Sequence, residues 1–225
     1  MRCLAPHEFI AAEPPVAFAA DEIQLWLLPP RPREQMRSDD PRWRPLLAAY
    51  VGVDPAALDL DRGEHGKPFL RRPDAPEFNV SHSRGVLLTG ISPHQPLGVD
   101  VEVVWRVRPV LDLAGRFFTA GEAEALARLD EARRQSAFLR LWTCKEAVLK
   151  ALGAGIGFGL DRLEFTLDEQ GVPGRLNVID ATAGAVDEWH IVRLEPAPDC
   201  YGALAWRGPP RPLRTFATAA ARGAR

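Results

Sequence analysis

The sequence has few cysteines for its 225 residues, and this scarcity excludes two classes of protein. Its three cysteines, Cys3, Cys144 and Cys200, are odd in number and lie far apart. They fit neither the disulfide framework of a small secreted protein nor the close ligand spacing of a zinc site. We expect all three to be reduced thiols in a cytoplasmic protein.

The sequence also lacks an excess of charge of either sign and any long apolar run. Its 28 Lys and Arg residues against 30 Asp and Glu residues give a net charge of -2, so bulk charge favours neither nucleic acid nor an acidic membrane surface. No apolar run approaches the length of a membrane span, and residues 1–22 carry acids and prolines where a signal peptide needs an apolar segment. We expect no nucleic acid and no membrane as partner, and any anion must be held locally.

What the sequence does contain is a succession of strand and helix patterns. Residues 23–28 alternate like a strand, and residues 43–51 have the apolar spacing of a helix that ends at Gly52. Strand patterns begin again at Phe78, helical patterns cover residues 117–152, and the last third alternates around Gly and Pro turns. These patterns predict an α+β fold.

The order of the patterns divides the chain into two halves of similar make-up. Residues 1–104 contain a strand, a helix and paired strands, whereas residues 105–225 contain helices and then antiparallel strands. We predict two α/β halves with a joint at residues 106–108. The Pro- and Arg-rich residues 209–225 are expected to form a flexible tail.

Two carboxylates stand close together in the segment Gly98-Val-Asp-Val-Glu102. In a strand, Asp100 and Glu102 point to the same face, where they repel one another unless a cation neutralises them. A charged and solvated sheet edge is the alternative. Because oxygen ligands without a nearby His or Cys suit a hard cation, a metal here would be Mg²⁺ ahead of Zn²⁺.

The helical segment Trp142-Thr-Cys-Lys-Glu-Ala-Val-Leu-Lys150 places a lysine inside an apolar stripe. Lys145 falls among apolar residues at helical spacing, so its side chain either extends to solvent or meets a specific anion. Glu146 and Lys150 stand in the order of an i,i+4 surface ion pair, which by itself is worth only about 0.3 kcal/mol.

Two further segments offer groups that could bind phosphate. The run Asn79-Val-Ser-His-Ser83 places hydroxyls and an imidazole between apolar segments, where they either gather on a phosphate or cap a turn. The loop His65-Gly-Lys-Pro68 offers Lys67 beside a glycine. Neither segment alone distinguishes a binding site from an ordinary turn.

Taken in order, the segments GKP, NVSHS, GVDVE, FFTAGE and WTCKEAVLKALGAG closely resemble the 4'-phosphopantetheinyl transferases of the surfactin-synthetase-activating type. The resemblance spans residues 63–165. It implies two similar α/β halves related by a pseudo-twofold axis, with coenzyme A in the cleft between them. It also implies transfer of the phosphopantetheine arm of coenzyme A to a serine of an apo acyl or peptidyl carrier protein, with release of adenosine 3',5'-bisphosphate.

The resemblance also implies roles for the residues singled out above. Asp100, Glu102 and Glu146 are expected to hold Mg²⁺, and Glu146 is expected to take the proton from the incoming serine. Lys150 is expected to meet the pyrophosphate of coenzyme A and to help its departure. Glu122, in FFTAGE, corresponds to an additional acid near the metal and is expected to take part in catalysis.

Four more contacts with coenzyme A follow from the resemblance. Ser81 and His82 resemble residues that grip the phosphorylated ribose, and Lys67 resembles a phosphate contact. Lys145 is expected to face the phosphates as well. Since enzymes of this long type are usually monomers, we expect a cytoplasmic monomer whose partners are coenzyme A and a carrier protein.

The chain departs from the family between the first strand and the GKP loop. There the family has a long arginine-rich helix, whereas this chain has only PPRPREQMRSDDPRWRPLLAAYVG. Whether Arg37, Arg42 or Arg44 takes over the contacts with the 3'-phosphate stays open from the sequence. The alternative function is a catalytically idle relative that still binds carrier proteins; the intact acids and lysines argue against it.

Overall fold

The computed structural model describes residues 1–19, 21–28, 40–105 and 108–218. The strands are β1 (Cys3–Leu4), β2 (Ile10–Ala11), β3 (Ile23–Leu28), β4 (Leu60–Arg62), β5 (Pro68–Leu70), β6 (Glu77–Ser83), β7 (Val86–Ser92), β8 (Leu97–Val103), β9 (Leu163–Leu167), β10 (Pro173–Ile179), β11 (Trp189–Ala197), β12 (Cys200–Arg207) and β13 (Leu213–Ala217). The helices are α1 (Trp43–Val51), α2 (Val110–Phe117), α3 (Ala120–Arg128) and α4 (Glu131–Leu152). This mixed composition confirms the predicted α+β class.

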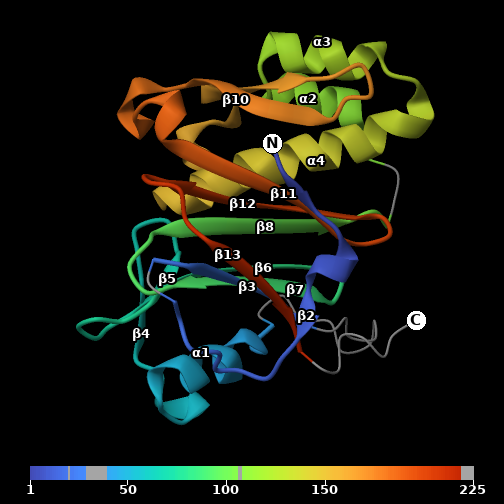
Figure 1. The fold of residues 1–225 in the computed structure, drawn as a ribbon. Coiled ribbons are helices and arrows are strands. Elements are labelled where there is room, and N and C mark those ends of the chain that lie inside the picture. Colours follow the sequence, from blue (N-terminus) through green and yellow to red (C-terminus); the bar gives the residue numbers. More distant parts are fainter. Residues whose placement is uncertain (20, 29–39, 106–107, 219–225) are drawn as a thin grey trace.

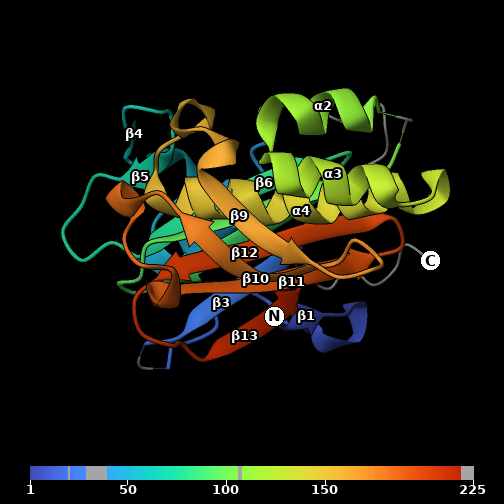
Figure 2. The same cartoon turned by 90° about the horizontal axis from the view of Figure 1, so that it is seen from above.

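Two sheets form the body of the molecule. Their strand orders are β1-β11-β12-β8 and β2-β13-β3-β7-β6, and they pack face to face over a shared apolar cluster. Helix α4 covers the first sheet from one side, helices α2 and α3 pack on α4, and α1 covers the second sheet from the other side (Figure 1). Seen from above, α4 lies over β12 (Figure 2). The result is a layered molecule in which α4 is packed directly on the first sheet.

Helix boundaries follow the local chemistry of the sequence. Helix α1 ends where Gly52 adopts a left-handed conformation with φ of 69°, and α4 ends in the same way at Gly153 with φ of 70°. The predicted helical stretch from residue 117 is interrupted because Thr119 accepts a hydrogen bond from Glu122 N and so starts a new helix, α3. Helices 43–51 and 133–152 were thus predicted closely, while α2 was missed.

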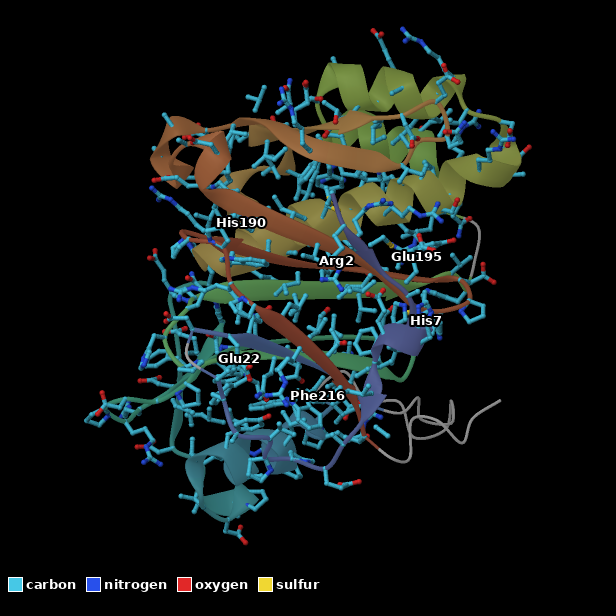
Figure 3. All side chains as sticks on the ribbon, in the orientation of Figure 1. Arg2, His7, Glu22, His190, Glu195 and Phe216 are labelled. Atoms are coloured by element: carbon cyan, nitrogen blue, oxygen red, sulfur yellow. The ribbon has the colours of Figure 1, made fainter. Side chains whose placement is uncertain are left out.

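The C-terminal residues correct one prediction. Strand β13 runs parallel to β3 and to β2, inside the second sheet, so the expected flexible tail at 209–225 is wrong for residues 213–217. Phe216 lies on this strand (Figure 3). Its buried ring lies 4.7 Å from that of Trp26 between centroids, and both belong to the apolar cluster that also contains residues of α1. Residues 219–225 lie outside the described residues.

The sheets do not follow the predicted division after residue 104. Strand β8, from the first half of the sequence, pairs with β12, and β13, from the second half, pairs with β3. Strand β1 likewise joins β11. Each sheet therefore contains strands from both halves; the pseudo-twofold relation stays a prediction, and the joint at 106–107 lies outside the described residues. None of the helices in the described part of the chain has the length and apolarity of a membrane span.

Candidate active site

Side chains, rather than a backbone ladder, join the two sheets at the site. Strands β6 and β8 are the edge strands of their sheets and lie side by side. Three alternate residues of β6 accept hydrogen bonds from three alternate N–H groups of β8. The pairs are Asn79 Oδ1 with Val99 N at 2.8 Å, Ser81 Oγ with Val101 N at 3.3 Å, and Ser83 Oγ with Val103 N at 3.2 Å. The NVSHS run is thus the seam between the two sheets.

Helix α4 packs closely on the face of β8 that carries Gly98, Asp100 and Glu102, because Gly98 has no side chain. A Cβ atom at this position would lie 2.1 Å from Ala147 O and 2.3 Å from Ala151 N. Close packing at Gly98 brings the last two turns of α4, with Glu146 and Lys150, over the strand that carries the acids. Two segments far apart in the sequence thereby form one site.

Asp100 is the centre of this site. Lys150 Nζ donates to Asp100 Oδ1 at 2.7 Å and to Ser81 Oγ at 3.1 Å, and the Ser81 hydroxyl donates to the same carboxylate oxygen at 2.9 Å. The other oxygen, Asp100 Oδ2, is buried without a hydrogen-bond partner among the described residues. Such an orphan acceptor is costly unless a ligand completes it.

Glu102, two residues further along β8, is held in a similar way. Ser83 Oγ and Arg108 Nη2 donate to Glu102 Oε2 at 3.1 and 3.0 Å. The pKa of Glu102 is raised above its ordinary value mainly by burial, and repulsion from Asp100 is the second cause. Arg108 was noted in the sequence only as part of the joint between halves, because nothing local to it signals a partner on β8.

Glu146 completes the acidic set. Burial is the main cause that raises the pKa of its carboxyl to about 7, and the negative charge of Asp100 adds to it. Its Oε1 atom is a second buried acceptor without a partner in the described chain. No three His, Cys, Asp or Glu side chains of the described residues form a ready metal site. Two orphan carboxylate oxygens in an all-oxygen donor set nevertheless fit a hard cation such as Mg²⁺.

A cleft opens beside these groups. A cavity of about 430 Å³ is lined by His65, Gly66, Lys67, Pro68, Asn79, Val80, Glu146, Lys150, Gly153 and Gly155. A second cavity of about 360 Å³ shares Lys67, Pro68 and Gly153 with the first and extends past Phe69 and Arg72. The two cavities therefore lie next to one another along the GKP loop, and we refer to them together as the groove.

Comparison with known proteins identifies the family. The profile of the 4'-phosphopantetheinyl transferase superfamily matches residues 96–198, which contain β8 and α4. The 4'-phosphopantetheinyl transferase HetI of Nostoc sp. is 29% identical over 90% of this chain and 94% of its own length. A phosphopantetheinyl transferase of Thraustochytrium sp. is 35% identical over 69% of this chain and 57% of its own length. The chain belongs to the 4'-phosphopantetheinyl transferase superfamily.

The comparisons confirm the family and the enzyme class that the motifs predicted. The Sfp transferase of Bacillus subtilis is also similar, at 30% identity over 57% of this chain and 56% of its own length. The chain thus spans nearly all of HetI and somewhat more than half of the other two relatives. Residues 96–198, which the family profile matches, contain the predicted metal acids Asp100, Glu102 and Glu146.

Two predicted site residues lie elsewhere in this phosphopantetheinyl transferase. Lys145 is fully buried, and its ammonium contacts Glu122 Oε2 at 2.5 Å, Leu160 O at 2.8 Å and Leu163 O at 2.6 Å. Glu122 is buried as well and also accepts from Phe165 N at 2.9 Å. The predictions that Lys145 faces the phosphates and that Glu122 is an acid near the metal are therefore wrong: the two charges neutralise one another inside the protein.

The residues expected to contact coenzyme A divide into two groups. Lys67 lines the cleft, although its Nζ already donates to Leu97 O and Lys150 O, both at 2.9 Å, and burial lowers its pKa. His82 is exposed and, by strand alternation, shares a face of β6 with the cleft residue Val80. Ser81 is different: its hydroxyl donates to Asp100 Oδ1 and accepts from Val101 N, and its contact with the ribose stays a prediction.

The arginines considered as replacements for the missing helix are engaged in the fold. Arg42 donates to Asp40 and to Gly85 O, and Arg44 donates to Pro55 O. Arg37 lies outside the described residues. Among the arginines of the described chain, Arg72 lines the second cavity, and no local sequence signal points to it.

Proposed function

We propose that this protein transfers the 4'-phosphopantetheine arm of coenzyme A to a serine hydroxyl of an apo carrier protein. The observation that carries the proposal is the convergence of three side chains: Glu146 and Lys150 line the cleft, and Lys150 Nζ binds the buried Asp100. An acid pair with orphan oxygens beside a lysine is suited to a pyrophosphate and a cation, and two neighbouring cavities of about 430 and 360 Å³ lie beside these groups.

The reaction is an in-line exchange at phosphorus. The carrier serine Oγ forms a bond to the phosphorus next to pantetheine, and the bond from that phosphorus to the bridging oxygen of the pyrophosphate breaks. The serine proton passes to Glu146, whose carboxylate faces the groove, and adenosine 3',5'-bisphosphate leaves. Lys150, which extends from the same helix one turn later, balances the charge that grows on the bridging oxygen.

A Mg²⁺ ion held by Asp100, Glu102 and Glu146 would stabilise the charge on the pyrophosphate. The orphan atoms Asp100 Oδ2 and Glu146 Oε1 support this assignment, because both are buried acceptors. Lys67 and His82 are the groups we assign to the phosphates of coenzyme A. We further propose that the protein works as a monomer in the cytoplasm, where its thiols stay reduced.

The test is transfer to a purified apo carrier. The protein is incubated with coenzyme A, MgCl₂ and the carrier, and the carrier is weighed by intact mass spectrometry. We expect the mass gain of a phosphopantetheine group with the native protein. With Glu146→Gln we expect the rate of transfer to fall by a factor of about 10² or more. The matched control is Glu124→Gln, a change to an exposed glutamate that pairs with Arg128 on α3. A folded native protein that modifies none of several carriers would instead support the idle binder.

A further inference from the structure

Ser81 and Ser83 make the same pair of hydrogen bonds, one step apart along the seam between the sheets. Each hydroxyl accepts from the N–H of a valine of β8 and donates to the carboxylate that precedes that valine. For Ser81 the partners are Val101 N at 3.3 Å and Asp100 Oδ1 at 2.9 Å. For Ser83 the partners are Val103 N at 3.2 Å and Glu102 Oε2 at 3.1 Å.

The repeat has a simple physical origin. Strand β8 is an edge strand, so alternate N–H groups point away from its backbone partner β12 and need acceptors. A serine hydroxyl has one proton and two lone pairs, so it can satisfy such an N–H and still donate to an acid. Because both strands have a period of two residues, one serine aligns with each acid.

We propose that Ser81 and Ser83 are positioning residues that fix the rotamers of Asp100 and Glu102, so that one oxygen of each acid is held on the protein and the other faces the metal. The proposal rests on the proposed metal site. Asp100 carries it most directly, because Oδ1 receives the Ser81 proton while Oδ2 is the buried orphan. Hydroxyls and carboxylates that orient metal ligands typically contribute a factor of about 10 to 100 in metal affinity.

The seam contains its own control. Asn79 makes the first rung of the same ladder, to Val99 N at 2.8 Å, but the residue that precedes Val99 is Gly98 and carries no acid. Asn79→Ala therefore removes a rung without releasing a metal ligand. A role in joining the sheets alone predicts equal effects for all three positions, whereas positioning of the acids separates the serines from the asparagine.

The experiment measures Mn²⁺ affinity by electron paramagnetic resonance on the purified full chain, without coenzyme A or carrier. We expect Ser81→Ala and Ser83→Ala each to raise the Mn²⁺ dissociation constant about tenfold. Asn79→Ala is expected to lower the melting temperature and to leave the dissociation constant within about twofold of the native value. Ser83→Thr keeps the hydroxyl at a half-buried position and is expected to restore native affinity.

The outcomes separate the inference from the proposed function. Mn²⁺ binding that is unchanged in both serine variants, or weakened as much by Asn79→Ala as by Ser83→Ala, would overturn the positioning role and leave the transferase proposal intact. A native protein that binds no Mn²⁺ would remove the metal site and this inference with it. Should Ser81→Ala fail to fold, the pair Ser83→Ala and Ser83→Thr decides the question.

Discussion

Gly98 sets how close α4 comes to the strand that carries the acids. The three atoms that an added Cβ would meet, Ala147 O, Ala151 N and Lys150 C at 2.1 to 2.8 Å, all belong to the helix backbone and cannot rotate away. We expect Gly98→Ala to destabilise the protein by about 1 to 3 kcal/mol and to slow phosphopantetheine transfer, since α4 must move with Glu146 and Lys150. Denaturant unfolding and the carrier assay measure the two effects.

A second glycine provides the control for this substitution. Gly115 lies inside α2, and a Cβ there would meet nothing within 4 Å. Gly115→Ala is therefore expected to stabilise the protein by about 0.5 to 1 kcal/mol through helix propensity. If Gly98→Ala is as stable as the native protein, the close contact between α4 and β8 does not set the position of the helix.

At the scale of elements, the buried pair Lys145–Glu122 anchors the other side of α4. It connects α4 to α3 directly and to β9 through Phe165 N, and the Lys145 ammonium also lies 4.9 Å from the ring centre of Phe118. Removal of one partner leaves an uncompensated buried charge. We expect Lys145→Met to cost about 3 to 5 kcal/mol, and the double variant Glu122→Gln/Lys145→Met to recover much of that loss.

A double-mutant cycle by denaturant unfolding measures this coupling. The exposed pair Glu124–Arg128 on α3 is the reference, and its coupling is expected to stay below about 0.5 kcal/mol. A double variant that costs as much as Lys145→Met and Glu122→Gln added together would show that the buried charges do not depend on one another.

The same pair shows what the sequence could and could not predict. Helix 133–152 and its end at Gly153 follow from apolar spacing and a glycine, both of which are local signals. The lysine in its apolar stripe was recognised as unusual, but its partners lie on α3 and before β9, and no spacing rule identifies them. The serines did carry a signal, because Ser81 and Ser83 have the same two-residue spacing as Asp100 and Glu102. The contacts between them form only because the edge strands β6 and β8 lie side by side, which no local pattern predicts.

At the scale of the whole molecule, the exchange of strands makes the two halves of the sequence depend on one another. Residues 1–104 contain β3 and β8 but lack β13, which pairs with one edge of β3, and β12, which pairs with β8. An isolated fragment 1–104 is therefore expected to remain unfolded, and the full chain is expected to unfold in a single transition. Phe216→Ala tests this from the far end of the chain, because Phe216 is buried against Trp26 in the sheet that contains most of the N-terminal strands.

We expect Phe216→Ala to destabilise the full chain by about 3 to 5 kcal/mol, with coincident transitions by tryptophan fluorescence and by far-UV circular dichroism. Phe69→Ala, at an exposed position on β5, is the matched control and is expected to change stability by less than about 1 kcal/mol. Two separate transitions in Phe216→Ala, one for each sheet, would show that α4 and β8 stay folded without the second sheet. Strand β8 would then fold without its contacts to β6, and the interaction between the two sheets would be limited to the hydrogen bonds of Asn79, Ser81 and Ser83.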